Sequence, residues 1–258
     1  MDNWNKVKSW ILVFLLSVAG EISFAQGVKD YRAVVQESFP HDISGYTQGL
    51  FFYNGTLYES TGQYGASSFR EVDLFTGNIL SRTDFPSNYF AEGSCVIDGR
   101  LYILTWQEGE CFVYDIASMS EMGRFRYDGE GWGLTTDGKS LIMSDGTSTI
   151  TFRDPMTFFP QRTVRVTLNN REISYLNELE YIGGKIWANV YGLDYVLIIN
   201  PQNGVVEGRI DCKDLLEPKY RNSYVDVLNG IACNPSDGSI YLTGKYWPKL
   251  YKISLKEK

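Results

Sequence analysis

The hydrophobic and polar positions of this chain form a hairpin pattern that occurs five times. In each copy a short apolar strand is followed by a turn of the Asn-Gly, Asp-Gly or Gly-Gly kind and then by a strand rich in β-branched and aromatic residues. The copies are QGLFFYNGTLYESTG (48–62), EGSCVIDGRLYILTW (92–106), WGLTTDGKSLIMSDG (132–146), NELEYIGGKIWANVY (177–191) and NGIACNPSDGSIYLTGK (229–245). This pattern predicts an all-β protein.

The spacing of the copies predicts a five-bladed β-propeller. Each copy begins roughly 40 to 50 residues after the previous one, and further strands follow each hairpin, as expected for blades of four strands. The last copy leaves room for three strands only. We therefore expect the segment YRAVVQE (31–37) to supply the fourth strand of the last blade and close the ring, which removes exposed sheet edges.

The first residue of each inner strand and the last residue of its partner meet at one edge of the sheet, because the two strands are antiparallel. In a propeller these positions surround one mouth of the central channel. They include Gln48, Glu92, Asn177, Asn229 and Lys245, together with Trp106, Trp132 and Tyr191. Burial of such polar groups is costly unless they are paired or used. A structural Glu92–Lys245 salt bridge with aromatic rim packing is the alternative, but the recurring aromatic residues favour a binding pocket.

The first 25 residues predict an export signal. Lys6 and Lys8 precede the apolar run WILVFLLSVA, and the small residues Ser23 and Ala25 precede the expected cleavage site. We therefore expect residues 26–258 to form a single propeller domain that is periplasmic or secreted, monomeric and free of the membrane after cleavage. An uncleaved N-terminal anchor is the alternative. The formal net charge of −7 argues against a nucleic acid partner.

The chain has four cysteines, Cys95, Cys111, Cys212 and Cys233. In an oxidising compartment they can form up to two disulfides, but their spacing indicates no pairing. Buried free thiols are the alternative, because several of these residues lie within apolar strands.

Six motifs occur in order along the chain from about Phe39 to Leu255: FPHDISGYTQGL, FAEG, GEGWGL, LNELEY, IWANV, and LNGIA followed by LTGKYWPKLY. They resemble the plant and bacterial type of glutaminyl-peptide cyclotransferase, the glutamine cyclotransferase family. The resemblance implies a five-bladed propeller that converts the N-terminal glutamine of peptides or proteins to pyroglutamate and releases ammonia.

The resemblance also implies the site residues. Glu92, Gln48, Asn177 and Lys245 are expected to be catalytic, and Trp106, Trp132, Tyr191, Phe90 and Tyr46 to bind substrate, with Asn229 added from its mouth position. Two positions depart from the plant pattern. Tyr191 stands where Trp is typical, and Tyr46 stands where Phe is found, so the pocket gains hydroxyl groups.

The residue types suit this reaction. The α-amine of the substrate attacks its own side-chain amide, so the two reacting groups are already tethered. Glu92 is expected to take a proton from the amine and deliver it to the leaving nitrogen. Lys245, Asn177 and Gln48 are candidates to stabilise the developing charge on the amide oxygen.

We expect no metal in catalysis. His41 is the only histidine, so a histidine-rich zinc site cannot be built. His41 is expected to have a turn or capping role, and a structural calcium ion held by backbone carbonyls is compatible with the resemblance. Two other functions remain: a noncatalytic peptide-binding propeller, and a lactonase-like hydrolase, which needs a metal held by several carboxylates where the mouth positions offer Glu92 alone.

Overall fold

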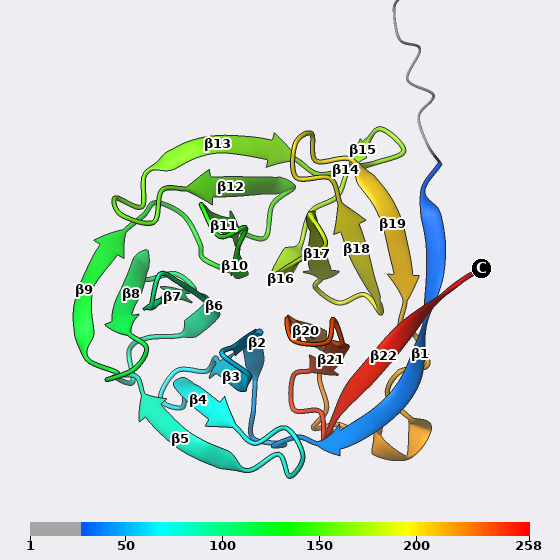
Figure 1. Cartoon of the computed structure of the whole chain (residues 1–258), viewed down its shortest axis with the longest axis horizontal. Coiled ribbons are helices and arrows are strands. Elements are labelled where there is room, and N and C mark those ends of the chain that lie inside the picture. Colours follow the sequence, from blue (N-terminus) through cyan, green and yellow to red (C-terminus); the bar gives the residue numbers. More distant parts are fainter. Residues whose placement is uncertain (1–26) are drawn as a thin grey trace, which may run out of the picture.

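The computed structural model describes residues 27–258, and the predicted export signal lies outside them. Apart from the short 3-10 helix η1 (Pro218–Tyr220), all regular structure in this range is β-strand. The sheets are arranged around a common centre (Figure 1), with the first strand of each hairpin innermost. The prediction of an all-β fold is confirmed, and the arrangement is propeller-like.

Three sheets have four strands each, joined in chain order. The first contains β2 (Thr47–Tyr53), β3 (Thr56–Thr61), β4 (Ser68–Val72) and β5 (Ile79–Asp84). The second contains β6 (Ala91–Ile97), β7 (Arg100–Thr105), β8 (Glu110–Asp115) and β9 (Glu121–Arg126). The third contains β10 (Leu134–Thr136), β11 (Leu141–Ser144), β12 (Thr149–Arg153) and β13 (Pro160–Arg165).

The remaining long strands form one eight-stranded sheet. It contains β16 (Leu176–Ile182), β17 (Lys185–Val190), β18 (Tyr195–Ile199), β19 (Val206–Asp211), β1 (Lys29–Pro40), β22 (Lys249–Glu257), β21 (Ile240–Gly244) and β20 (Leu228–Cys233), in that spatial order. A two-stranded ribbon of β14 (Thr167–Leu168) and β15 (Arg171–Glu172) lies between β13 and β16 in the chain.

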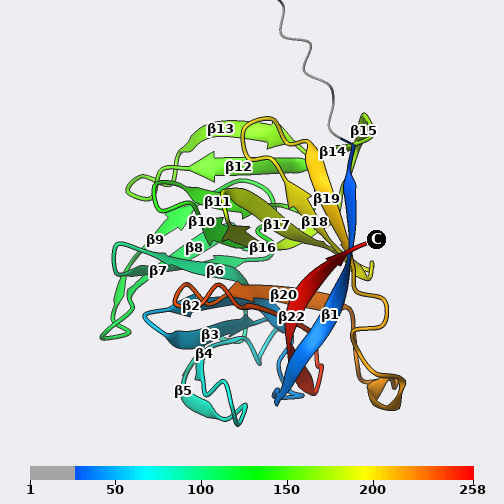
Figure 2. The ribbon, with the colours of Figure 1, turned by 45° about the vertical axis from the view of Figure 1, so that its right-hand side comes forward.

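Strand β1 joins the two halves of the eight-stranded sheet. Its first residues, Lys29 to Arg32, pair in parallel with β19. Along its length it also pairs antiparallel with β22, from Tyr31 opposite Glu257 to Pro40 opposite Lys249. Figure 2 shows the two strands side by side at the edge of the molecule. The segment 31–37, expected to be a strand, lies within β1.

All five expected hairpins are present: β2–β3, β6–β7, β10–β11, β16–β17 and β20–β21. The turn residues explain why they form. Asn54 and Gly55 have φ values of 50° and 82°, and Asp98 and Gly99 have 50° and 74°. A two-residue turn with φ positive at both positions matches the twist of the strands that it joins, and Asn-Gly and Asp-Gly tolerate it best.

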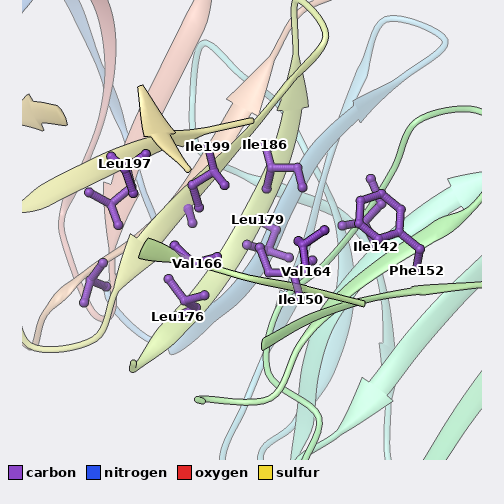
Figure 3. Packing of buried hydrophobic residues seen from close by; sticks show 13 residues of the cluster. Ile142, Ile150, Phe152, Val164, Val166, Leu176, Leu179, Ile186, Leu197 and Ile199 are labelled. Carbon is purple, nitrogen blue, oxygen red and sulfur yellow. The ribbon is translucent and has the colours of Figure 1, made fainter. Parts of the chain in front are cut away.

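The hydrophobic core lies between neighbouring sheets. In the largest cluster, Ile142, Ile150 and Phe152 from β11 and β12 pack with Leu179 and Ile186 from β16 and β17 (Figure 3). All five side chains are buried. Each contributes about 1.5–3 kcal/mol relative to an exposed position, so these contacts hold adjacent sheets in a fixed relation around the centre.

The four cysteines are free thiols, three of them buried and Cys233 partly exposed. The alternative of free thiols is therefore the one found in the structure, and the four cysteines form no disulfide. Burial raises the pKa of the Cys95 and Cys111 thiols, so both are neutral. No helix within residues 27–258 is long and apolar enough to span a membrane.

Candidate active site

Four inner strands carry a β-bulge at the position of an expected site residue. The register shifts between Thr47 and Gly49 in β2, Ala91 and Ser94 in β6, Leu176 and Leu179 in β16, and Leu228 and Ile231 in β20. These intervals contain Gln48, Glu92, Asn177 and Asn229. A bulge removes residues from the strand ladder and re-aims their side chains. The fifth inner strand, β10, begins two residues after Trp132.

Glycines next to these residues let the inner strands approach closely. A Cβ atom on Gly49 would lie 2.7 Å from the Ser94 nitrogen, and one on Gly93 would lie 2.4 Å from the Leu134 nitrogen. A Cβ atom on Gly133 would lie 2.0 Å from the Asn177 carbonyl oxygen. No side chain fits at these distances, so glycine is required for the close approach that gathers the site residues.

Glu178 occupies the corresponding position after Asn177, where the other copies have glycine. Its buried carboxyl group accepts hydrogen bonds from the Leu50 N–H at 3.3 Å and from the Ile231 N–H at 2.9 Å. It therefore connects β16 to β2 and to β20. Burial, reinforced by the nearby Glu180, raises the pKa of Glu178 well above its ordinary value.

The re-aimed side chains meet in a cavity of about 210 Å³. Nine of the ten predicted site residues line it: Tyr46, Gln48, Phe90, Glu92, Trp106, Trp132, Asn177, Tyr191 and Lys245. The five hairpins thus contribute to a single pocket. The hairpin geometry therefore brings together residues that lie up to about 200 positions apart in the sequence.

Glu92 is the buried acid of the pocket, with 4% of the residue exposed. Its Oε1 accepts a hydrogen bond from Gln48 Nε2 at 2.9 Å, and within residues 27–258 no side chain donates to its other oxygen. Burial raises the pKa of Glu92 well above its ordinary range. Lys245 opposes this shift, whereas the negative charges of Glu130 and Glu108 add to it. The carboxyl group is therefore set for proton exchange nearer neutral pH.

Lys245 is the buried cation, with 2% of the residue exposed. Its Nζ lies 4.3 Å from the centroid of the Tyr46 ring and 5.2 Å from that of Tyr191, so aromatic faces hold the charge. Burial lowers the pKa of Lys245 to about 8, although Glu92 and Asp226 oppose the shift. Because Lys245 forms no salt bridge with any carboxylate of residues 27–258, the alternative of a structural Glu92–Lys245 pair is wrong.

Asn177 offers a polar group that the described chain leaves unpaired. The residue is 2% exposed, and its Oδ1 is buried without a hydrogen-bond partner. An unpaired buried amide costs about 1–3 kcal/mol. A ligand in the cavity that hydrogen-bonds to Asn177 recovers this free energy, so the residue is suited to binding a polar group of the substrate.

Two aromatic walls enclose the pocket. The Phe90 ring makes edge contacts with Tyr46, at a centroid distance of 6.0 Å, and with Trp106, at 5.5 Å. On the other wall, Trp132 and Tyr191 lie 5.9 Å apart at an interplanar angle of 82°. Edge contacts of this kind are favourable for aromatic rings. Tyr191 is thus part of the wall despite its departure from the Trp expected there.

Asn229 differs from the other predicted site residues, because it does not line the cavity. It is completely buried, and its Nδ2 donates to the Thr47 carbonyl oxygen at 2.8 Å and to Gln48 Oε1 at 3.3 Å. Asn229 therefore fixes Gln48 from behind. The expected contact of Asn229 with substrate stays a prediction, and the position of the side chain outside the cavity lining does not favour it.

The sequence reasoning missed Glu130 and Asp226. Glu130 Oε2 accepts hydrogen bonds from the indole N–H groups of both Trp106 and Trp132. The negative charge of Asp226 opposes the lowering of the Lys245 pKa. Burial raises the pKa of Tyr46, and the charge of Asp226 is the next largest cause. Neither residue occupies a hairpin end. The nearest signal was the place of Glu130 in GEGWGL, two residues before Trp132.

His41 has a structural role other than the expected turn or cap. Its Nδ1 lies 2.7 Å from the Trp247 carbonyl oxygen, and its Nε2 lies 3.2 Å from Glu59 Oε1. Because both partners are acceptors, both ring nitrogens donate and the imidazole is charged. Burial opposes this state, but the Glu59 charge and hydrogen bond outweigh it and raise the pKa of His41.

No group of three or more His, Cys, Asp or Glu side chains in the described part of the chain is placed to hold a metal ion. The carboxylates near the pocket instead accept hydrogen bonds from indole, amide and hydroxyl groups. Tyr64 donates to Glu108 at 2.8 Å, for example.

The fold and the pocket define a class: propeller-like all-β proteins in which a buried carboxyl group and a buried amine face one aromatic cavity. Comparison with known proteins narrows this class. The family model described as glutamine cyclotransferase matches residues 10–255. The chain belongs to the glutamine cyclotransferase family.

Two relatives are similar over most of the chain. A glutaminyl-peptide cyclotransferase of Arabidopsis thaliana is 43% identical over 245 residues, which cover 93% of this chain and 76% of the relative. The crystal structure of Myxococcus xanthus glutaminyl cyclase superposes with a TM-score of 0.84 and 35% identity, covering 90% of this chain and 99% of that one.

A more distant structure is similar in fold alone. The WD40 β-propeller domain of Doa1 has a TM-score of 0.50 at 14% identity, over 80% of this chain and 62% of that chain. This likeness supports the propeller-like arrangement of the sheets.

Proposed function

We propose that this protein is a glutaminyl-peptide cyclotransferase, which converts the N-terminal glutamine of peptides or proteins to pyroglutamate and releases ammonia. Family membership and the similarity to two glutaminyl cyclases support this function. The observation that carries it to particular residues is the placement of Glu92 and Lys245 in one aromatic cavity, where neither charge is neutralised by the other.

Glu92 acts as the proton shuttle. The substrate α-amine forms a bond to the carbon of its own side-chain amide, and the bond from that carbon to the amide nitrogen breaks. Glu92 accepts the proton that the amine loses and delivers it to the departing nitrogen, which leaves as ammonia. A positioned acid–base group of this kind contributes about 10²–10⁴ in rate. Gln48 holds one oxygen of Glu92, so the other is directed to the substrate.

Lys245 stabilises the tetrahedral intermediate, and Asn177 orients the substrate. Lys245 has its ammonium hydrogens free of hydrogen bonds to the described chain, so they can donate to the amide oxygen as it becomes negative. The unpaired Oδ1 of Asn177 is an acceptor, so it binds an N–H group of the bent substrate. Donors that are already in place lower the barrier because no reorganisation is needed during the reaction. None of these steps requires a metal ion.

We infer that the fold is a five-bladed propeller completed by its N-terminal strand. Four groups of four strands follow the chain order, and β20, β21 and β22 form a fifth group with β1 as the outermost member. The antiparallel register between β1 and β22 supports this assignment. The additional parallel contact of β1 with β19 links the fourth and fifth groups through the same strand.

Ammonia release tests the function. The protein is incubated with a peptide that begins with glutamine, with and without a chelator, and the loss of one ammonia is followed by mass spectrometry. The same peptide with glutamine in the second position is the control. Loss of ammonia that the chelator does not prevent is expected. Tight binding without turnover would favour a noncatalytic peptide-binding protein, and a chelator-sensitive product that has taken up water would favour a metal-dependent hydrolase.

The Glu92→Gln variant tests the mechanism. It keeps the shape of the side chain but removes its basicity, so we expect kcat to fall at least about a hundredfold while the peptide still binds. Calorimetric titration with the peptide measures binding separately from turnover. If kcat is retained in Glu92→Gln, the role assigned to Glu92 is wrong.

Four expectations stay predictions: export after cleavage near Ala25, a single propeller domain in residues 26–258, a monomeric state and a structural calcium ion. N-terminal analysis of the purified protein tests the cleavage site, and light scattering tests the monomer. Metal analysis of the protein before and after dialysis against chelator tests the calcium ion.

A further inference from the structure

The wall of the pocket is a closed circuit of side-chain contacts. Aromatic edges connect Tyr46 to Phe90 and Phe90 to Trp106, and a further edge connects Trp132 to Tyr191. Two charged groups complete the circuit. Lys245 lies over the ring faces of Tyr46 and Tyr191, and Glu130 accepts from the indole edges of Trp106 and Trp132.

The contact of Glu130 with the two indoles is specific. Its Oε2 lies 2.8 Å from Trp106 Nε1 and 2.9 Å from Trp132 Nε1, so one oxygen atom accepts both hydrogen bonds. An indole has a single polar group, and that group can only donate. Both tryptophans therefore have their one hydrogen bond directed to the same atom, which fixes the angle between two side chains of different hairpins.

The opposite oxygen of Glu130 is also held. Gln107 Nε2 donates to Oε1 at 3.1 Å. Partial burial opposes ionisation, but the hydrogen bonds from Trp132, Gln107 and Trp106 outweigh it and lower the pKa of Glu130. A carboxylate that accepts three N–H groups is a permanent anion at neutral pH, and hydrogen bonds to an anion are stronger than neutral ones.

Glu130 does not line the cavity, so it touches the walls rather than the space that the substrate occupies. Its negative charge nevertheless acts on Glu92, since it is among the causes of the raised pKa of that acid. Glu130 thus has two effects that are separable by experiment, one on the indoles and one on the proton shuttle.

We propose that Glu130 is a positioning residue of the active site, whose ionised carboxylate sets the orientation of the Trp106 and Trp132 indoles and so the fit of the glutaminyl side chain between them. The claim that the side chain between the indoles is that of glutamine rests on the proposed function. The orientation of the indoles by Glu130 does not depend on it.

The Glu130→Gln variant tests the proposal. Glutamine is neutral and accepts through one oxygen only, so both indoles lose their charged acceptor and their hydrogen bonds are weakened or lost. We expect KM for a glutamine-initiated peptide to rise roughly tenfold or more, since a hydrogen bond to a charged group is lost, while kcat changes less. Glu37→Gln, on an exposed position of β1, is the matched control and should leave both constants unchanged.

The pH profile provides a readout that a purely structural role would not change. Removal of the negative charge in Glu130→Gln lowers the pKa of Glu92, so the acid limb of the kcat/KM profile should move to lower pH. Glu130→Asp retains the charge on a shorter side chain. It should keep the acid limb near its wild-type position while KM still rises, which separates the charge effect from the hydrogen-bond effect.

The indole N–H resonances of Trp106 and Trp132 test the contact without any turnover. In the wild type these two protons should be shifted downfield and exchange slowly with solvent, and in Glu130→Gln both should move upfield and exchange faster, because an amide is a weaker acceptor than a carboxylate. If the resonances and KM of Glu130→Gln match those of the wild type, the proposal is overturned. If the wild type releases no ammonia, the proposed function fails, and the indole resonances alone then decide the role of Glu130.

Discussion

Gln48 holds Glu92 by one oxygen, because its Nε2 donates to Glu92 Oε1 at 2.9 Å. The orientation of the Gln48 amide is set in turn by Asn229, whose Nδ2 donates to Gln48 Oε1 at 3.3 Å. The two hydrogen bonds from Asn229 to Gln48 and from Gln48 to Glu92 therefore connect three inner strands. Its consequence is that the free oxygen of Glu92 has a defined direction.

The Gln48→Leu variant should reduce kcat by about 10- to 100-fold, because a hydrogen bond to a charged group contributes about 1.5–3 kcal/mol. Leucine keeps the volume but removes the donor, so KM should change less than kcat. Asn229→Ala should have a smaller effect of the same kind. Steady-state kinetics of both variants with a glutamine-initiated peptide check this order. A larger loss in Asn229→Ala than in Gln48→Leu would contradict it.

Lys245 should produce the alkaline limb of the activity profile. Burial lowers the pKa of Lys245 to about 8, so the ammonium is present below this pH and is lost as pH rises through it. Activity that depends on the charge should fall in the same interval. Lys245→Arg, which stays charged at every pH of interest, should shift this limb to higher pH. Lys245→Met should reduce kcat by about 10²–10³ below pH 8, as for the loss of an oxyanion donor, and by less above pH 8, where the wild type has also lost the charge.

His41 should make the stability of the protein depend on pH above neutrality. Its folded-state pKa is raised above the value of 6.5 for an unperturbed histidine by its pairing with Glu59, against the opposing effect of burial. The stabilisation from this group is therefore complete below pH 6.5 and is lost as pH rises through the folded-state pKa. Asp42 and Arg70 are the other charged groups of this cluster, linked at 2.9 Å.

Two measurements check the His41 prediction. His41 is the only histidine, so its imidazole proton resonances report its pKa without assignment ambiguity. The free energy of unfolding as a function of pH should decline above pH 6.5 in the wild type and less steeply in His41→Gln. A measured His41 pKa below 6.5 would exclude the buried ion pair.

Glu178 should contribute to the stability of the protein although it does not line the cavity. In Glu178→Ala the N–H groups of Leu50 and Ile231 lose their acceptor, at a cost of about 1–3 kcal/mol each. Glu178→Gln retains one of the two acceptor oxygens, so it should be less destabilising than Glu178→Ala. Chemical denaturation of the two variants measures the difference.

The pH dependence of the Glu178 variants provides a second check. The pKa of Glu178 is raised in the folded state, whereas the unfolded chain loses this proton near pH 4.5. Stability from this group is therefore highest below pH 4.5 and declines as pH rises toward the folded-state pKa. Glu178→Gln should remove this part of the decline. An unchanged pH dependence would show that Glu178 is ionised in the folded protein.

Much of the site was predictable, because hairpin geometry relates positions along the chain to positions in space. Antiparallel pairing places the start of one strand beside the end of the next, so the sequence alone predicts that Glu92 and Trp106 lie at one edge. The same argument placed Lys245 with Gln48. The hairpin turns were equally readable, since Asn54-Gly55 and Asp98-Gly99 specify a local backbone conformation.

What was not predictable depends on contacts between separate sheets. Glu130 belongs to a loop, and its role arises from two indoles that the hairpin rule treats separately. The charge of His41 required knowledge that Glu59 and the Trp247 carbonyl group lie on either side of the ring. Asn229 lies behind Gln48 rather than beside the cavity because its amide bonds to the Thr47 carbonyl group and to Gln48 of another sheet, which periodicity does not reveal.

The pairing of β1 with β22 has a consequence for how the protein folds. Gln48 follows β1 and Lys245 precedes β22, so the strands that bracket these two residues come from the first and last parts of the described chain. Because Pro40 and Lys249, at one end of this pairing, are about 200 residues apart in the chain, the β1–β22 pairing is a long-range contact that forms late in folding. The cavity that holds Glu92 and Lys245 is therefore completed only when these two distant strands have met.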